Sequence, residues 1–433
     1  MKLENKKLLL MGGGAYANDI ERYKNATGFK IIALGRDSNT PIAKISDIFY
    51  HVDTQDIEGV KAVVNKEKID GIFVGASEVN IEPAIKISEQ TDARFYVTAK
   101  QWEILANKAT FKRYCLEYGV PVVPEYKIPA DYKRGDIENL NYPVLLKPTD
   151  SSGARGMNAC YRADDFDKFY AEAMSWSKKK EVIIEELITG ADEVFFQYTI
   201  QNGECSLTSC FTKVFVKSEN DNLILPIFHM YPSKYIDEYF ATVHESVCRM
   251  FKAIGIRDGV MTLQSFYRDG RFYVFEAGFR MGGAQNYILT DYQWGINSLN
   301  CMINYALTGS MSDTPIKEKD NARFRYPCCN YYVGLKSGTI ARMCGIDEVR
   351  SMPGVLNVTV MCKEGDEIPE TNALERVCLR IHVVGKTPEE LAETLVKISE
   401  TLEIMSDNNE EMQIEHLTYD RCLAAIHDTT SFN

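Results

Sequence analysis

A lysine at the end of an apolar strand, followed by a run of small residues, can hold a polyphosphate. In YPVLLKPTDSSGARG, the apolar run Val144-Leu145-Leu146 predicts a strand that delivers Lys147 and breaks at Pro148. The lysine supplies a compact cation, and the glycines up to Gly156 allow main-chain N–H groups to approach phosphate oxygens closely. Because the same composition also describes an ordinary surface loop, other stretches must agree before a nucleotide site is inferred.

A second stretch, EVIIEELITGADE, lies about forty residues further on. Val182-Ile183-Ile184 predicts a strand that ends at Glu185, and Asp192 and Glu193 follow a glycine turn. A carboxylate at a strand end can bind the edge of an adenine, and an acidic pair can accept hydrogen bonds from ribose hydroxyls. The alternative is a solvated acidic turn without a ligand.

A third stretch, residues 261–283, alternates apolar and polar residues on both sides of Asp269-Gly270 and predicts a β-hairpin. A loop of odd length would place Gln264 directly across from Glu276, whereas a two-residue loop would place them on opposite faces. Glu276 ends an apolar strand, where a carboxylate needs a partner, and Mg²⁺ is a partner that also binds phosphates. Arg280 would face the same pocket; the alternative is a Glu/Arg salt bridge.

These three stretches, in this order and at these spacings, resemble the ATP-grasp superfamily over roughly residues 100–310. In that family two lysines, a Gly-rich loop, a strand-end acidic residue and a late acidic pair clasp Mg-ATP between two α+β subdomains. The resemblance implies that Lys108, on a predicted helix over residues 101–119, is the first lysine and Lys147 the second. It implies a phosphate loop from residue 151 to 156 that includes Ser151, Ser152, Gly153 and Gly156.

The resemblance also implies that Glu185 and the main chain of Glu186 and Ile188 meet the adenine. For the ribose, Asp192 is the first choice and Glu193 the second. The strand lysine Lys213 is a candidate for the γ-phosphate or a substrate carboxylate, or else is an exposed strand lysine. His229 is either a substrate-facing residue or a structural histidine.

The metal positions of the family fall on Gln264 and Glu276, and Arg280 takes the position that steadies the reacting phosphoryl or carboxylate group. Two departures matter. Gln264 stands where the family has an acidic residue, and Gly278 stands where it has an asparagine. We therefore expect ATP with Mg²⁺, for which Mn²⁺ can substitute, and one of two metal ions held weakly or by another residue.

The chain has 433 residues, enough for about three domains. Strands at residues 7–11, 29–34, 71–74 and 94–97 predict a parallel α/β domain over residues 1–99, the pre-ATP-grasp domain of the resembling proteins. A two-subdomain ATP-grasp fold is expected over residues 100–315. Strands at 326–333, 338–344, 356–361 and 377–384, then a helix with a capping box at 387–390, predict a C-terminal α+β domain over residues 316–433. That domain resembles those of biotin carboxylase and L-amino acid ligases, which close the pocket or form a dimer contact.

Composition limits the classes of partner. A net charge of −12 argues against nucleic acid as a partner. Twelve cysteines without paired spacing favour free thiols in a reducing cytoplasm, and no apolar run approaches the roughly 20 residues that cross a membrane.

A competing pattern lies at the start of the chain, where Gly12-Gly13-Gly14-Ala15-Tyr16-Ala17 fits a GxGxxA dinucleotide fingerprint and Asp37 follows the second predicted strand. An NAD-dependent oxidoreductase is therefore one alternative.

The favoured hypothesis is that the protein is an ATP-dependent carboxylate–amine ligase. Such an enzyme forms an acyl phosphate and then an amide, and releases ADP and phosphate. Its partners would be ATP, a small carboxylate and an amine, with amino acids among the candidates, and the resemblance implies a homodimer. A phosphotransferase, a bicarbonate-dependent carboxylase and a nucleotide-binding regulator without turnover stay open as alternatives.

Overall fold

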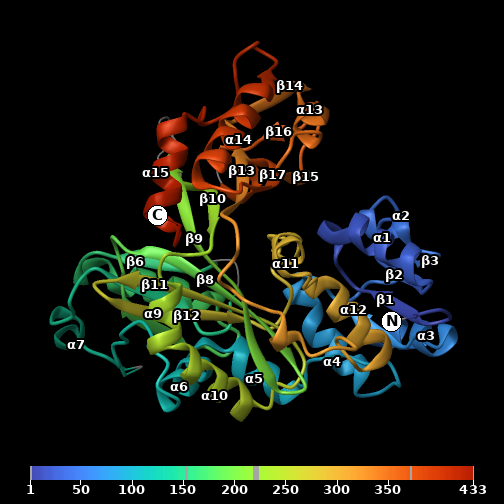
Figure 1. The fold of residues 1–433 in the computed structure, drawn as a ribbon. Helices are drawn as coiled ribbons and strands as arrows, with labels where there is room; N and C mark the ends of the chain where they lie inside the picture. Colours follow the sequence, from blue (N-terminus) through green and yellow to red (C-terminus); the bar gives the residue numbers. More distant parts are fainter. Residues whose placement is uncertain (1, 130, 152–154, 218–223, 371–372, 433) are drawn as a thin grey trace.

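The computed structural model describes residues 2–129, 131–151, 155–217, 224–370 and 373–432. The N-terminal part is a four-stranded parallel sheet in the order β3-β2-β1-β4, next to the central domain (Figure 1). Its strands are nearly continuous buried apolar runs, as expected for a parallel sheet covered on both faces. Its elements are β1 (Lys7–Leu10), α1 (Ala17–Thr27), β2 (Lys30–Leu34), α2 (Pro41–Ile45), β3 (Ile48–Tyr50), α3 (Ile57–Glu67), β4 (Gly71–Phe73) and α4 (Ile81–Ser88).

The strand predicted at residues 94–97 is wrong. In this segment Arg94 makes one isolated bridge to Gly71, and β3, which lies beside β2, is the sheet's fourth strand. The short β3 has too few apolar residues to stand out in the sequence.

The glycine turn after β1 packs closely on the end of β4, and Tyr16 just beyond it contacts the segment after β12. A Cβ on Gly12 would lie 2.3 Å from the carbonyl oxygen of Val74, so this position has no room for a side chain. The hydroxyl of Tyr16 donates to the carbonyl of Gly282 in the central domain at 2.8 Å. Asp37 accepts hydrogen bonds from its neighbour Asn39. The features that suggested a dinucleotide therefore have structural roles.

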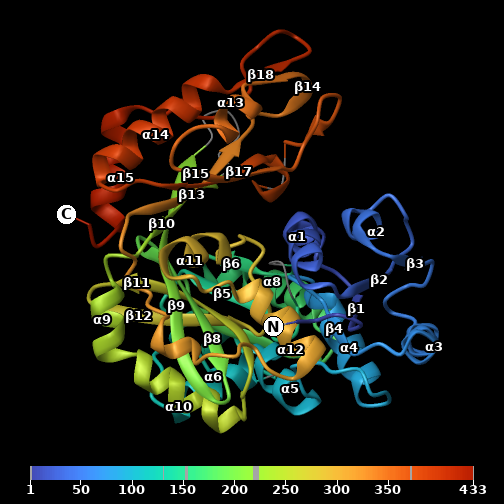
Figure 2. The ribbon, with the colours of Figure 1, turned by 45° about the vertical axis from the view of Figure 1, so that its right-hand side comes forward.

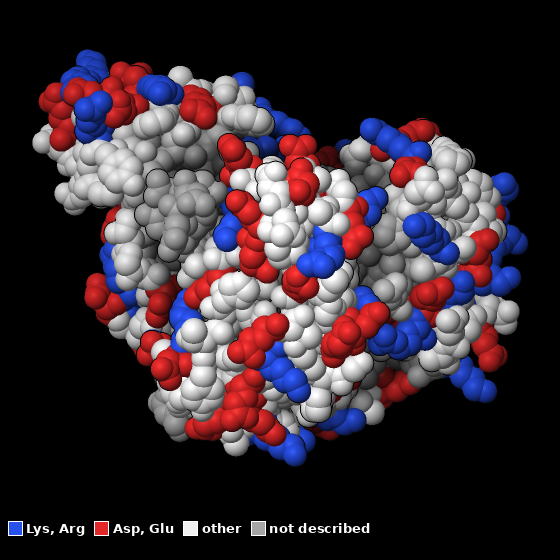
Figure 3. Space-filling view, turned by 90° about the horizontal axis from the view of Figure 1, so that it is seen from above, with Lys and Arg blue, Asp and Glu red and all other residues white. Residues whose placement is uncertain are grey.

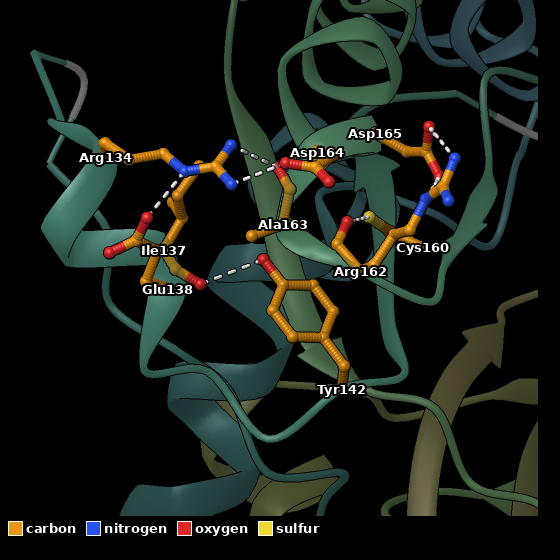
Figure 4. Close-up of polar contacts among 9 residues, drawn as sticks. All are labelled: Arg134, Ile137, Glu138, Tyr142, Cys160, Arg162, Ala163, Asp164 and Asp165. Atoms are coloured by element: carbon orange, nitrogen blue, oxygen red, sulfur yellow. Dashed lines mark hydrogen bonds and ion pairs between the residues drawn. The ribbon is translucent and has the colours of Figure 1, made fainter.

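A small subdomain precedes the first strand of the central sheet in the sequence. It is a three-stranded antiparallel sheet in the order β6-β5-β7 with its own apolar cluster. Arg134 ties its first helix to a distant turn, donating to Glu138 at 2.8 Å and to Asp164 at 2.5 Å (Figure 4). The elements are α7 (Arg134–Glu138), β5 (Val144–Pro148), β6 (Asn158–Cys160), α8 (Phe166–Trp176) and β7 (Val182–Glu186).

One eight-stranded antiparallel sheet runs through the rest of the molecule in the order β12-β11-β8-β9-β10-β13-β17-β15 (Figures 1 and 2). Strand β10 pairs with β13, so the C-terminal part continues the central sheet. The strands are β8 (Asp192–Gln201), β9 (Glu204–Lys217), β10 (Ile224–Tyr231), β11 (Gly259–Arg268), β12 (Arg271–Gly278), β13 (Cys328–Gly334), β15 (Val355–Val360) and β17 (Val377–Val384). The two boundaries between the three proposed domains stay predictions.

The two faces of this sheet have different roles. Because side chains alternate along a strand, Phe196 and Tyr198 of β8 point to one face, where Phe196 stacks on Tyr239 at 3.5 Å. Phe195 and Gln197 point to the other face and line a cavity. The helices around the sheet are α5 (Ala99–Ala106), α6 (Lys108–Glu117), α9 (Ile236–Thr242), α10 (His244–Ile254), α11 (Tyr287–Trp294) and α12 (Ser298–Thr308).

The remaining C-terminal elements are β14 (Gly338–Cys344), α13 (Ile346–Arg350), β16 (Glu367–Ile368), α14 (Pro388–Thr401), β18 (Glu403–Ser406) and α15 (Tyr419–Thr429). Thr387 caps α14 by accepting from the N–H of Glu390, as predicted. The reciprocal half of the predicted capping box differs, because the Glu390 carboxylate accepts from the N–H of Lys386 instead.

Acidic and basic side chains are interspersed on the upper face of the molecule (Figure 3). Among the described residues, no helix has the length and apolar character needed to cross a membrane.

Acid should weaken this fold through His382 of β17. This side chain is fully buried and its Nε2 donates to the carbonyl of Ala284. Burial, with Arg380 nearby, lowers the pKa of His382 from 6.5 to about 3. The unfolded chain therefore takes up this proton first, and stability is lost as pH falls below 6.5, by up to about 1.4 kcal/mol per pH unit.

We expect a His382→Asn variant to lose less stability than the parent chain between pH 7 and pH 5, measured by urea unfolding. His51→Asn, at an exposed histidine, is the matched control. Parallel pH dependences of the His382→Asn and parent chains would contradict this assignment.

Candidate active site

Lys108 lies in the first turn of α6 and faces the end of β5. The predicted helix over residues 101–119 is two helices, because the Asn107 side chain accepts from the N–H of Thr110 and starts a new helix there. The Lys108 ammonium donates to the carbonyl of Ser151 at 2.5 Å, and its main-chain N–H donates to Thr149 at 2.9 Å. Burial lowers the pKa of Lys108, and the charge of Glu276 opposes this shift. A lysine beside a helix N-terminus suits an anion.

Lys147 lies on β5 and belongs to a buried charge cluster that the sequence did not reveal. Glu185 of β7, only 3% exposed, forms ion pairs with Lys147 and with Lys112 of α6, the latter at 2.5 Å. Glu125 lies 3.5 Å from the same Lys112 ammonium. Lys112 was missed, although its position four residues after Lys108 places both on one side of the helix.

The cluster limits what the predicted adenine residues can do. The Glu185 carboxylate is bound by two lysines, and Glu186 pairs with Arg268 at 2.8 Å. Ile188 is buried. Main-chain atoms of this segment are therefore the groups left for a base, and the adenine assignment stays a prediction.

The ribose candidates lie at the start of β8 and have protein partners. Asp192 accepts from the hydroxyl of Tyr235, and Glu193 pairs with Lys213 of β9 at 2.8 Å. The Lys213 ammonium also lies 4.4 Å from the centre of the Phe195 ring. Because each of the two acids already binds a protein side chain, a ribose would compete with that partner. The order of preference between Asp192 and Glu193 as the ribose ligand therefore stays a prediction.

Gln264 and Glu276 are cross-strand partners, as required for a shared metal site. The hairpin loop nevertheless has two residues, Asp269 and Gly270, because Arg268 pairs with Arg271. The expectation that such a loop separates Gln264 from Glu276 is wrong, because Phe275 is an extra residue of β12 and forms a bulge that shifts the register.

The phosphate loop is only partly described. Ser152 and Gly153 lie outside the described residues. Ser151 lines the larger cavity described below, and Gly156 has φ +72°, where a Cβ would lie 2.7 Å from the Trp176 side chain. Gly156 is thus required for both its backbone conformation and its contact.

Two cavities meet at the end of β12. The larger, of about 870 Å³, is lined by Lys108 and Ser151, and the smaller, of about 140 Å³, by Gln264. Five residues line both: Glu78, Glu276, Ala277, Gly278 and Arg280. The structure therefore brings Lys108, Ser151, Gln264, Glu276 and Arg280 to one place. Among the described residues, the 185–188 segment lines neither cavity. The other predicted site residues that line neither cavity are Lys147, Asp192, Glu193 and Lys213.

Glu78 is a further residue that the sequence reasoning missed. It follows β4 of the N-terminal part and pairs at 3.2 Å with Arg280 of the segment after β12. Its place beyond the carboxyl end of a parallel strand, where open α/β sheets bind ligands, was an available signal.

The smaller cavity has an aromatic wall. The rings of Phe195, Phe211 and His229 stack one upon the next. The ring centres of Phe195 and Phe211 are 5.0 Å apart, and those of Phe211 and His229 are 4.4 Å apart. His229 Nδ1 lies 3.1 Å from the Tyr332 hydroxyl, and burial, with nearby Lys213, holds the pKa of His229 well below 6.5. His229 is therefore neutral at physiological pH and is both buried and cavity-facing.

The C-terminal part fixes the far wall of this cavity. Arg380 donates to the carbonyl of Gly283 at 2.6 Å, and His382 donates to the carbonyl of Ala284 at 3.0 Å. Gln285 of the same segment accepts from the Thr359 hydroxyl at 2.8 Å. Contacts from both the N-terminal part and the C-terminal part of the chain thus fix the segment after β12.

Thr262 is the polar neighbour of Gly278. The two residues are cross-strand partners, and a Cβ on Gly278 would lie 2.8 Å from the Thr262 hydroxyl oxygen. A hydroxyl oxygen therefore stands beside the position where the resembling family has an asparagine.

Two families of known proteins match parts of this chain. Residues 107–310 match the family described as Carbamoyl-phosphate synthase L chain, ATP binding domain, and residues 332–405 match L-amino acid ligase C-terminal domain 2. A formate-dependent phosphoribosylglycinamide formyltransferase from Saccharolobus solfataricus is 25% identical over 189 residues, which cover 42% of this chain and 47% of the relative. The chain spans about half the length of most curated relatives that it matches.

Solved structures share the fold over nearly the whole chain. Phosphoribosylglycinamide synthetase from Anaerococcus prevotii has a TM-score of 0.73 at 18% identity, covering 93% of this chain and 100% of that one. An L-amino acid ligase from Bacillus licheniformis has a TM-score of 0.72 at 18% identity, covering 94% and 100%. The predicted fold class, with a parallel N-terminal sheet and a large antiparallel sheet, is confirmed.

Proposed function

We propose that the chain is a member of the ATP-grasp superfamily and that it is an ATP-dependent ligase that joins a small carboxylate to an amine. One observation carries the proposal: Glu276 and Arg280 line both cavities. A nucleotide whose phosphates reach Lys108 in the larger cavity would present its terminal phosphoryl group to a substrate in the smaller one. The matching family is described as an ATP binding domain, which supports the nucleotide.

In the proposed reaction, a carboxylate oxygen in the smaller cavity attacks the γ-phosphorus, and the bond to the ADP oxygen breaks. The amine nitrogen then attacks the acyl carbon of the mixed anhydride, and phosphate leaves. Lys108 and Arg280 neutralise phosphoryl oxygens in both steps, so positioning and electrostatics supply most of the rate. The amine loses a proton, and Glu78, a carboxylate on the same wall, is the acceptor that we propose.

Magnesium fits the donors at this place. Glu276 and Gln264 offer oxygen atoms from facing positions of one hairpin, and the Thr262 hydroxyl is a further oxygen beside Gly278. When bound, Mg²⁺ would offset the negative charge of the phosphates. We propose Glu276 and Gln264 as its ligands, with Mn²⁺ able to replace it.

A Gln264→Glu variant should retain activity and reach half-maximal rate at a lower magnesium concentration, because a second carboxylate strengthens the oxygen site. The measurement is ADP formation as a function of free Mg²⁺. Gln55→Glu, which adds a carboxylate to the larger cavity at a residue that does not line the smaller one, is the matched control. Complete loss of activity in Gln264→Glu alone would mean that position 264 is not a metal site.

The smaller cavity limits the acyl substrate. A volume of about 140 Å³ admits only a small molecule, and its wall combines the Phe195–Phe211–His229 stack with one cation, Arg280, and two anions, Glu78 and Glu276. We propose a small carboxylate with a planar or apolar side chain, with amino acids as first candidates. The match to an L-amino acid ligase C-terminal domain supports this choice.

The test is release of ADP and phosphate from Mg-ATP with pooled amino acids and small carboxylates, each combined with pooled amines, followed by mass spectrometry. ADP with equal phosphate, and a product one water lighter than its parts, is the expected result. ADP without free phosphate would instead identify a phosphotransferase. ATP binding without ADP for any pair would favour a regulator, an alternative that Gln264 and Gly278 keep open.

We also propose a cytoplasmic homodimer. All twelve cysteines are free thiols, as in a reducing compartment. A related biotin carboxylase domain from Hydrogenobacter thermophilus is described as a dimer. Light scattering of the purified chain tests the oligomeric state, and a monomeric mass at micromolar concentration would exclude the dimer.

A further inference from the structure

A pair of thiols and a histidine lie on the sheet face opposite the smaller cavity. Cys205 is near the start of β9, and His244 and Cys248 lie one turn apart on α10. This is the face to which Tyr198 of β8 points. Cys205 and Cys248 are both partly exposed, whereas most of the other cysteines are buried.

The histidine is held in place to contact one thiol. His244 Nε2 lies 3.7 Å from the Cys248 sulfur, and Nδ1 lies 3.2 Å from the Tyr198 hydroxyl. The imidazole stacks on the Tyr198 ring with centres 5.7 Å apart and planes at 9°. When Tyr198 donates to Nδ1, the Nε2–H is directed to Cys248, which favours a thiolate there.

The second thiol, Cys205, further favours the thiolate form of Cys248. Hydrogen bonding with Cys205 and then with His244 lowers the pKa of Cys248 to about 6, against the opposing effects of burial and Glu245. The same contact raises the pKa of Cys205, which stays a thiol, although the nearby Lys317 acts in the other direction. One sulfur is thus a nucleophile and the adjacent one a proton-bearing partner.

We propose that Cys248 is a modification site for low-molecular-weight disulfides, and that Cys205 is its resolving thiol. The Cys248 thiolate attacks one sulfur of the disulfide, the S–S bond breaks, and one thiolate leaves with the bonding electron pair. Cys205 then loses its proton to solvent and attacks the Cys248 sulfur, which expels the second thiolate. Two protein thiols are oxidised to one disulfide, and the small disulfide is reduced to two thiols.

The site lies apart from the smaller cavity. It lies on the far face of the sheet from Gln197 and Phe195, which line the smaller cavity. The chemistry of Cys248 can therefore be measured whether or not the ligase reaction is correct.

Alkylation by iodoacetamide, followed by mass spectrometry of each cysteine peptide, tests the nucleophile. At pH 6.5 we expect Cys248 to react about tenfold faster than Cys344, the exposed cysteine of β14, because the thiolate is the reacting form. His244→Asn should remove most of this difference, while Phe240→Leu, which changes the other ring neighbour of His244, should keep it. Equal rates for Cys248 and Cys344 in the parent chain would overturn the proposal.

Incubation with glutathione disulfide tests the partner. The parent chain should lose two hydrogen masses and yield a peptide that links Cys205 to Cys248, whereas Cys205→Ser should stop at a glutathione adduct on Cys248. A linked Cys362–Cys378 peptide, from the other pair of neighbouring thiols, without a Cys205–Cys248 link, would overturn the proposal. So would a stable adduct on Cys248 in the parent chain, because Cys205 would then not resolve it.

Discussion

In a Glu276→Ala variant, ADP formation from Mg-ATP should fall by about 10³-fold while the chain keeps its fold. Glu276 lines both cavities and is the cross-strand partner of Gln264 in the hairpin. If Glu276 is the metal ligand that we propose, its removal weakens Mg²⁺ binding, and the phosphates lose the positive charge that compensates them during transfer. Single-turnover ADP formation measures the loss, and far-UV circular dichroism measures the fold.

The matched control is Arg271→Ala, an exposed residue at the start of the same strand, which should leave ADP formation within about twofold of the parent chain. Full activity of Glu276→Ala would exclude Glu276 as a metal ligand. Equal loss in both variants would show that the hairpin itself is damaged, and circular dichroism would then differ from that of the parent chain.

The hairpin shows what the sequence can and cannot specify. The alternation of apolar residues correctly placed β11 and β12, and Asp269-Gly270 correctly marked the turn. Which face of the sheet each side chain points to then depends on a single extra residue. One bulge reverses the face of every residue beyond it. Phe275 is that residue; its ring stacks on Phe266 at 4.5 Å, a packing contact that no local pattern encodes.

Long-range pairing is the second limit. The strands of the C-terminal part were located from their own alternation, and β14 and β17 have the predicted bounds. That β13 would pair with β10 and extend the central sheet depends on contacts between residues about one hundred positions apart. Similarly, Glu78 could be placed at a strand end, but its partner Arg280 lies two hundred residues away.

The charge cluster around Glu185 shows the same limit for the site. A lysine on a helix is usually solvated, and nothing in the segment around Lys112 distinguishes it from Arg113, its neighbour. The fold decides the matter by bringing Lys112 of α6 next to Glu185 of β7, so that Lys112 is 6% exposed and bound to Glu185. Lys112 gives Glu185 a second cation, so the carboxylate would keep one ion pair if Lys147 binds a phosphate, as the resemblance implies.

Lys112→Met should therefore weaken both the fold and nucleotide binding. Breaking a buried ion pair costs about 3–5 kcal/mol, and we expect a loss near the lower end because Lys147 still contacts Glu185. The Kd for ATP should rise about tenfold, since Lys147 becomes the only lysine left on that carboxylate. Urea unfolding and calorimetric titration measure the two effects, and Lys112→Arg should restore most of both.

Lys127→Met is the matched control, because Lys127 is exposed and pairs with Glu125, the second acid near Lys112. An exposed pair contributes about 0–1 kcal/mol, so this variant should resemble the parent chain. In a Glu185→Gln background the further effect of Lys112→Met should shrink, because the two residues act through one contact. Additive losses would mean that Lys112 stabilises the fold independently of Glu185, and an unchanged Kd for ATP would remove its link to Lys147.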